Sequence, residues 1–268
     1  MFANARMYSL NPVLAQAWRE LLQWVVDRAQ ADIEVIDYPA PQPLPALWAR
    51  ADLACAFMCG YPLARAQPAP TVLAAPLPSP ARYAGQAHYC SDLIVRADSG
   101  IDTLADAWGR RMAFTTPDSM SGYQAPRRFL APHAATRGGR LFASMVGPLI
   151  TPRAVVQAVL QGDAELGPLD SYALDLLRAH EPALVAPLKV IASTAFTPIP
   201  PLVGAAGLDA TIAQRLGAAL LAVASAPALA ALRSALLLRG FARISPAAYH
   251  ANILATEEAD ALGYRQLA

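Results

Sequence analysis

The segment RMAFTTPDSMSGYQAPRRFL, residues 111–130, decides the fold class of this chain. RMAFT at 111–115 is apolar and predicts a short strand, and the residues from Gln124 onward begin a helix. The turn between them, TPDSMSG at 116–122, is rich in hydroxyl groups and ends on a glycine. A strand that runs through a short turn into a helix is the repeating unit of α/β folds, in which ligands bind at the carboxyl ends of strands.

The same alternation of strand and helix continues on both sides of this segment, which predicts an α/β fold with mainly parallel strands. The first helix is expected from Pro12 to about Ala31, with Asn11 as its N-cap. Its apolar stripe, which should pack on a sheet, consists of Leu14, Trp18, Leu21, Leu22 and Val25. The predicted strands are residues 2–6, 32–37, 52–58, 71–76, 89–96, 111–115, 142–146, 165–169, 188–195 and 201–205.

Two α/β lobes are expected, because 268 residues exceed the usual size of a single core. No internal repeat or low-complexity linker separates them, so the lobes must share strands as hinges. The hinge candidates are YCSDLIVRADSG at 89–100 and LKVIAST at 188–194. The predicted boundaries assign 1–90 plus 193–268 to the first lobe and 91–192 to an inserted second lobe. The pattern becomes helical from about residue 205, and this C-terminal tail should cover one lobe's sheet.

The composition argues against several classes of function. With 55% hydrophobic and 15% charged residues the chain has ample core material, and its net charge of +1 with scattered arginines argues against nucleic acid as a partner. The apolar residues 216–238 are interrupted by Ser225, Pro227 and Arg233, which favours a pair of core helices over a membrane span. The three cysteines lack CxxC spacing and are predicted to be buried free thiols.

The hydroxyl-rich turn is the strongest candidate for a ligand site. Ser119 and Ser121 offer hydroxyl donors, and Gly122 lets an anion approach the backbone. The exposed amides of a helix's first turn, here through Tyr123, carry the positive end of the helix dipole. Such a turn holds phosphate, phosphonate, sulfonate or carboxylate oxygens without a cationic side chain. The alternative is that one serine is only an N-cap.

Other candidates follow predicted strands at their carboxyl ends. Cys59-Gly60-Tyr61 combines a glycine with an aromatic wall and a hydroxyl, and Met7 and Tyr8 hold the corresponding position after the first strand. The alternative for the first group is a structural turn whose tyrosine packs on the next helix. Asp170 is most simply the N-cap of a helix, but a carboxylate facing a cleft would also bind an amine or a hydroxyl group.

No assembled catalytic site is found, and no cofactor or metal site is predicted. The histidines at 88, 133, 180 and 250 are dispersed and do not have zinc-ligand spacing. The GxSxG, GxxxxGK[ST] and GxGxxG motifs are missing, which removes the usual support for hydrolases, NTPases and dehydrogenases. Cys59 as a nucleophile has no histidine partner that the sequence identifies.

A succession of motifs resembles the phosphonate, phosphite and phosphate type of solute-binding proteins of ABC transporters. Over about residues 1–205, their order and spacing match this family. The resemblance implies a type II periplasmic-binding-protein fold, in which two hinge crossovers join two α/β lobes and the ligand lies between them. The motifs are MYSLNP (7–12), CGYP (59–62), YCSDLIVRADSGIDTLADAWGRRMAF (89–114), DSMSGYQAPR (118–127) and AVLQGDAELGPLDS (158–171).

The resemblance also assigns site residues. Ser119 to Gly122 are similar to the family's loop that holds phosphonate oxygens, while Tyr8, Tyr61 and Tyr89 match aromatic walls and Asp170 an aspartate at the far end of the cleft. Ile150-Thr151-Pro152 departs from the family, because a histidine-containing tripeptide usually stands there. Thr151 offers a hydroxyl group instead, which removes one strong donor to a doubly charged phosphonate. Ser91 and Thr116 complete the expected ligand-binding set.

The function expected from these observations is capture of a small anionic solute for uptake, with an ABC permease as partner. The resemblance implies a periplasmic location. MFANARMYSLNP, however, lacks the regions of a secretory signal, so a full-length chain of this sequence is expected in the cytoplasm. Two alternatives stay open: a ligand-sensing module, and an enzyme of the same fold similar to chorismate-derivative lyases or thiamine-pyrimidine synthases, with Asp170 or Cys59 acting on the substrate.

Overall fold

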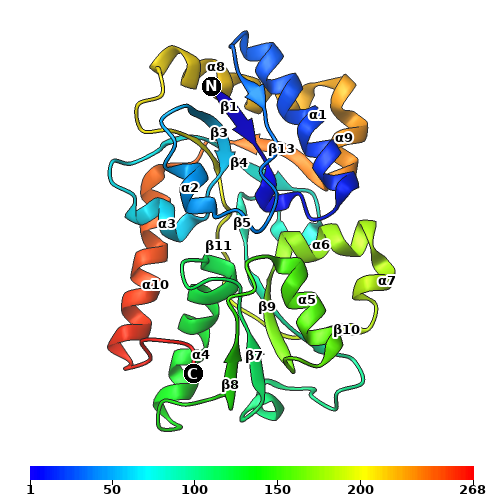
Figure 1. The fold of residues 1–268 in the computed structure, drawn as a ribbon, viewed down its shortest axis with the longest axis vertical. Helices are drawn as coiled ribbons and strands as arrows, with labels where there is room; N and C mark the ends of the chain where they lie inside the picture. Colours follow the sequence, from blue (N-terminus) through cyan, green and yellow to red (C-terminus); the bar gives the residue numbers. More distant parts are fainter. The chain divides into compact units, whose positions relative to one another are not determined.

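The computed structural model describes residues 1–268, which form two compact units (Figure 1). The first unit consists of Met1–His88 and Pro198–Tyr249, and the second of Tyr89–Thr197 and His250–Ala268. The chain therefore passes from one unit to the other three times. The difference from the expected lobes lies in the last residues of the chain, which were expected in the first lobe and belong to the second unit.

The first unit is built on a six-stranded sheet with the order β13-β4-β12-β3-β1-β2. β1 pairs in parallel with β2 and β3, whereas β12 runs antiparallel to β3 and β4, and β13 runs antiparallel to β4. The parallel pairs bring the carboxyl ends of β1, β2 and β3 to one edge of the sheet. The strands are β1 (Phe2–Asn4), β2 (Glu34–Val35), β3 (Leu53–Phe57), β4 (Thr71–Pro78), β12 (Leu202–Gly204) and β13 (Leu238–Ala242).

Helix α1 (Pro12–Ala29) forms as its sequence predicts. The Asn11 side chain accepts a hydrogen bond from the Leu14 amide at 2.8 Å, which caps the helix. All five residues of the predicted apolar stripe are buried, and the Trp18 ring packs edge-on against Phe57 of β3 with centroids 5.0 Å apart. Helix α1 also packs on α8 (Ala210–Ala222) and α9 (Ala230–Ala235).

Two short helices complete the first unit. Helices α2 (Leu44–Trp48) and α3 (Gly60–Arg65) contribute Leu47 and Leu63 to a core cluster that contains Phe2 and Leu53 of the sheet. No single helix of the chain has the length and apolar character needed to cross a membrane, whereas residues 210–225 and 227–235, bent by 76°, meet that test only as a pair and only by length and composition.

The second unit contains a five-stranded sheet with the order β10-β6-β9-β7-β8. β7 pairs in parallel with β8 and β9, and β6 runs antiparallel to β9 and β10. Both sheets are thus mixed. The strands are β6 (Ser91–Arg96), β7 (Arg111–Ala113), β8 (Ser144–Val146), β9 (Leu166–Asp170) and β10 (Leu188–Ser193); β5 (His88–Tyr89) and β11 (Thr197–Pro198) form a two-stranded sheet.

Two long helices pack side by side in the second unit. Helices α4 (Ala125–Ala135) and α10 (His250–Ala261) lie against each other, as Figure 1 shows in green and red. Leu130 and Ala259 from these helices share a core cluster with Met112 and Leu166 of the sheet. Helix α5 (Pro152–Gln161) packs on β9, where Gly167 leaves room for the Val155 side chain. Helices α6 (Ser171–His180) and α7 (Pro182–Val185) follow in the chain.

The C-terminal tail shows where the sequence pattern was insufficient. Every predicted strand has a counterpart in the structure, but the tail, expected to be wholly helical, also contains the strand β13. Helix α10 covers part of the second unit, because its buried residues meet the apolar face of α4 rather than the first sheet.

Candidate functional site

The predicted residues of the second unit gather at one edge of its sheet. β7, β8 and β9 are parallel, so their carboxyl ends share this edge, and a helix follows each of them. The antiparallel β6 begins at the same edge, where Ser91 pairs with Asp170. The residues at or directly beside this edge are Tyr89, Ser91, Thr116, Ser119, Ser121, Gly122, Tyr123, Thr151 and Asp170. We call it the helix-start edge.

The hydroxyl-rich turn begins a helix, as predicted. A π-helical turn spans Met120–Gln124 and continues directly into α4. The Ser119 hydroxyl accepts the Gly122 amide at 3.0 Å, and the Ser119 carbonyl accepts the Gln124 amide at 3.0 Å. The N-cap interpretation of Ser119 is therefore confirmed, and a hydroxyl that accepts one hydrogen bond still has its own proton to donate. Ser121 is partly exposed on the same turn.

Two buried hydroxyl groups at this edge have no hydrogen-bond partner. They are Thr115 Oγ1, just after β7, and Ser91 Oγ, at the start of β6. Thr115 is 6% exposed and Ser91 only 1%. Thr115 Oγ1 lies directly beside Gly122, under the serine turn. Buried polar groups are nearly always paired, so these two hydroxyl groups still have hydrogen-bonding capacity at the helix-start edge.

Thr151 is held next to this turn by the backbone. The amides of Leu149 and Ile150 donate to the carbonyls of Phe114 and Thr115 at 3.1 and 3.2 Å. Thr151 then caps α5, its hydroxyl accepting the Ala154 amide at 3.1 Å. Ile150 takes a φ of 66°, a left-handed conformation that is costly for a β-branched residue. The structure thus brings a second hydroxyl-capped helix start to the same edge.

Asp170 adds a negative charge to the third helix start. Its side chain accepts the amides of Tyr172 and Ala173 at 2.9 and 3.0 Å, which confirms its predicted role as N-cap of α6. The residue is 6% exposed. Burial, and to a lesser degree the Asp170 carboxylate, raises the pKa of Tyr172 well above its usual value, so this phenol stays neutral.

The first-unit candidates lie at the carboxyl ends of β1 and β3, with mixed outcomes. Tyr8 and its neighbour Met7 belong to a short helical turn, but the Tyr8 ring is buried and packs edge-on against Phe57, with centroids 5.0 Å apart. Tyr61 is partly exposed, and its hydroxyl accepts a hydrogen bond from Arg65 at 2.7 Å. Cys59 and Gly60 are buried at the start of α3. A ligand role for these residues stays a prediction.

Arg6 is a charged residue that the sequence prediction missed. It lies two residues after the end of β1, is half-buried, and its guanidinium lies 5.5 Å from the centroid of the Tyr38 ring. Burial lowers the pKa of Arg6, although a guanidinium keeps its charge at neutral pH. The sequence signal was a cation directly before the candidates Met7 and Tyr8. It did not stand out, because arginines are scattered along the whole chain.

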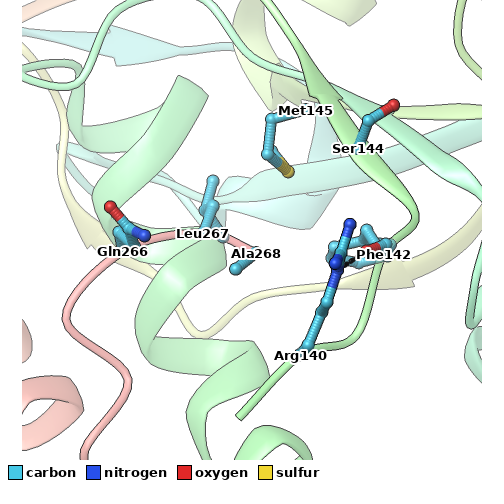
Figure 2. Close-up of a pocket in the computed structure, with 7 residues that line it drawn as sticks. All are labelled: Arg140, Phe142, Ser144, Met145, Gln266, Leu267 and Ala268. Atoms are coloured by element: carbon cyan, nitrogen blue, oxygen red, sulfur yellow. Dashed lines mark hydrogen bonds between the residues drawn. The ribbon is translucent and has the colours of Figure 1, made fainter.

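A cavity of about 360 Å³ opens elsewhere in the second unit (Figure 2). It lies beside Ser144, where β8 begins, whereas the predicted site lies where β8 ends. The Arg140 side chain at its rim donates to the Phe142 carbonyl at 3.0 Å. Its lining residues, none of which was a predicted site residue, are Arg140, Phe142, Ser144, Met145, Gln266, Leu267 and Ala268.

Several solved structures share this fold. PhnD1 from Prochlorococcus marinus, solved in complex with methylphosphonate, matches with a TM-score of 0.77 at 16% identity over 98% of both chains. A binding-protein component of an ABC phosphonate transporter from Pseudomonas aeruginosa gives 0.73 at 17% identity, over 98% of this chain and 97% of that one. A Xanthomonas citri protein bound to ATP gives 0.67 at 19% identity over 98% of both chains.

At these identities the structural matches show the fold, which is that of the type II periplasmic binding proteins. No curated protein matches the chain by sequence. A family model for the periplasmic substrate-binding protein of phosphonate ABC transporters matches residues 11–249, which is most of the chain. The predicted resemblance is thereby confirmed, and the chain belongs to the family of phosphonate-type periplasmic substrate-binding proteins of ABC transporters.

Proposed function

We propose that this chain is a solute-binding protein whose second unit holds the oxygens of a small anion at the serine turn, residues 119–123. The observation that carries the proposal is the buried, unpartnered Thr115 Oγ1 beside Gly122, directly under a helix start that Ser119 caps. A helix start attracts negative charge, and an unpartnered buried hydroxyl beside it supplies the second, independent sign of a polar ligand.

The donors at this edge are neutral. Ser119, Ser121 and Thr151 offer hydroxyl groups, and the first-turn amides of a helix that lack a partner within it add N–H donors. Hydrogen bonds to a charged group contribute roughly 1.5 to 3 kcal/mol each. Four such bonds at the upper end of this range, set against an association cost at the lower end of ~4 to 15 kcal/mol, give about micromolar affinity, so micromolar is the tightest binding that this donor set supports.

The Asp170 carboxylate limits the charge of the ligand. It lies at the same edge as the serine turn, so a second negative charge on the ligand near α6 is disfavoured. The preferred ligand is an acid with a single negative charge near the turn and an amine or hydroxyl group toward Asp170. Family membership and the methylphosphonate complex of the Prochlorococcus relative support a phosphonate-type acid.

The proposal includes delivery of this solute to an ABC permease, in the periplasm. Its support is the family, whose members are the substrate-binding components of such transporters. Candidate ligands differ in charge and in the number of their oxygens, so a panel of acids that varies both identifies the ligand.

Thermal stability and calorimetry with methylphosphonate, 2-aminoethylphosphonate, phosphate, sulfate and acetate test the proposal. We expect one acid to bind the wild type with micromolar affinity, and Ser119→Ala/Ser121→Ala to weaken it by about tenfold or more, ~1.4 kcal/mol or above. Ser144→Ala, which removes an exposed hydroxyl at the other end of the sheet, is the matched control. An unchanged dissociation constant in the double variant rules out the serine turn as the anion site.

A further inference from the structure

We propose that Arg127 is a positioning residue that braces the serine turn against the C-terminal segment 250–268. This inference rests on the proposed function of the turn. Arg127 lies on α4, and its side chain is only 4% exposed. A buried guanidinium must be fully hydrogen-bonded to be tolerated, so its partners show what it holds together.

Three of its hydrogen bonds reach the C-terminal segment. Nη1 donates to Asp260 Oδ1 at 2.5 Å and to the Tyr264 carbonyl at 2.9 Å. Nη2 donates to the Thr256 carbonyl at 3.0 Å. Asp260, with a side chain 52% exposed, supplies the counter-charge. Arg127 thus fixes both α10 and the residues that follow it.

The fourth hydrogen bond connects Arg127 to the serine turn. Its Nε donates to Gln124 Oε1 at 3.0 Å. Gln124 Nε2 in turn donates to the Pro117 carbonyl at 2.6 Å. Pro117 lies in the loop between Thr115 and Ser119, so the relay runs from the C-terminal segment to the backbone that places the Ser119 hydroxyl.

A second, independent contact also joins the serine turn to the C-terminal segment. The Leu267 amide donates to Tyr123 Oη at 3.1 Å, and the Tyr123 ring packs edge-on against Phe114 at the end of β7. The side chain of Tyr123 is therefore anchored to the C-terminal segment at one end and to the end of β7 at the other. The turn is held at Pro117, Tyr123 and Gln124, which reduces the ordering cost when an anion binds.

A neighbouring ion pair allows the bracing of the serine turn to be tested apart from the simple attachment of α10 to α4. The Arg128 Nε lies 2.5 Å from Glu258 Oε2, which joins the same two helices at the surface, with side chains 47% and 55% exposed. Arg128 is not part of the Gln124–Pro117 relay. Arg128→Gln therefore removes a link between α4 and α10 and leaves the relay intact.

The informative variant is Gln124→Glu, because Arg127→Met leaves the buried carbonyls of Thr256 and Tyr264 without their donor and risks unfolding. A glutamate keeps an acceptor for Arg127 but loses the N–H that holds the Pro117 carbonyl. We expect amide hydrogen exchange in residues 116–124, measured without any anion, to become about tenfold faster. The dissociation constant of methylphosphonate should rise by about tenfold. Arg128→Gln should change neither.

Unchanged exchange in Gln124→Glu would overturn the brace, and so would faster exchange with unchanged affinity. The two proposals fail separately. If the wild type binds no member of the anion panel while Gln124→Glu still accelerates exchange in 116–124, the proposed function fails and the brace stands as a contact that orders the turn.

Discussion

Thr115 and Gly122 pack so closely that a side chain at position 122 would force its neighbours to move. A methyl group on Gly122 would overlap Thr115 Oγ1 and lie 2.9 Å from Thr115 Cβ and 3.0 Å from Ser119 Oγ. The glycine is thus required for the turn to close over the strand end, whereas its predicted role in letting an anion approach the backbone stays a prediction.

Gly122→Ala should therefore distort the serine turn. Overpacking of this kind costs ~1 to 3 kcal/mol, and the displaced amides should weaken anion binding as well. Gly207→Ala is the matched control, because no heavy atom lies within 4 Å of a Cβ at that position and its backbone is not left-handed. Urea unfolding and calorimetry of both variants check the prediction, which fails if Gly122→Ala keeps wild-type stability and affinity.

Thr151 should contribute to both stability and binding. Thr151→Ala removes the cap of α5 at a cost of about 1 kcal/mol, and it also removes a hydroxyl donor at the helix-start edge. Asp209→Ala removes a similar cap, from α8 in the first unit, where the Asp209 side chain accepts the Thr211 amide at 2.9 Å. Both variants should lose stability, but only Thr151→Ala should bind the anion more weakly, and Thr151→Ser should restore both properties. Equal affinity in the two alanine variants would limit Thr151 to capping.

Much of this structure was predictable because the relevant interactions are local. Asn11, Ser119 and Asp170 each accept amides two or three residues ahead, so a residue type and a helix start suffice to predict them. The apolar stripe of α1 is equally local, because helical periodicity alone selects the buried face. Because parallel strands end at the same edge of a sheet, the caps that follow β7 and β9, Ser119 and Asp170, lie at one edge.

The features that were not predicted depend on long-range contacts. Arg127 meets Asp260 across 133 residues, and no periodicity indicates which unit α10 joins. Thr115 seemed an ordinary end of a strand, because its unpartnered hydroxyl appears only when Gly122 folds onto it. Strand β13 contains Gly240 at φ 153° and was concealed by the helix-forming residues before it.

Cys55 should make the protein less stable in alkali. Burial in β3 raises the pKa of this thiol from 9.0 to about 12, so the folded state keeps a proton that the unfolded state loses. The stabilising contribution is complete below pH 9.0 and is lost as the pH rises toward about 12.

Urea unfolding at about pH 8 and about pH 10.5 measures this effect as a fall in the free energy of unfolding. The fall should be smaller in Cys55→Ala, which has no thiol to ionise. Buried tyrosines such as Tyr172, whose pKa is also raised, contribute in the same direction and remain in both proteins. An identical fall in wild type and variant would show that Cys55 does not contribute.

Asp170 should control which acids are bound. Asn caps helices about as well as Asp, so Asp170→Asn keeps the start of α6 while removing the negative charge at the helix-start edge. Affinity for 2-aminoethylphosphonate should fall by about tenfold, because its ammonium loses an opposite charge. Affinity for doubly charged phosphate should rise, because a repulsion is removed.

The control for Asp170→Asn is Asp175→Asn, which changes the net charge equally from a position further along α6, where Asp175 pairs with Arg178 at 3.2 Å. Calorimetry with both acids on both variants and the wild type measures the selectivity. A switch in preference confined to Asp170→Asn would place the carboxylate within reach of the ligand's second group. Parallel shifts in both variants would instead trace the effect to net charge, and unchanged affinities in Asp170→Asn would reduce Asp170 to the cap of α6.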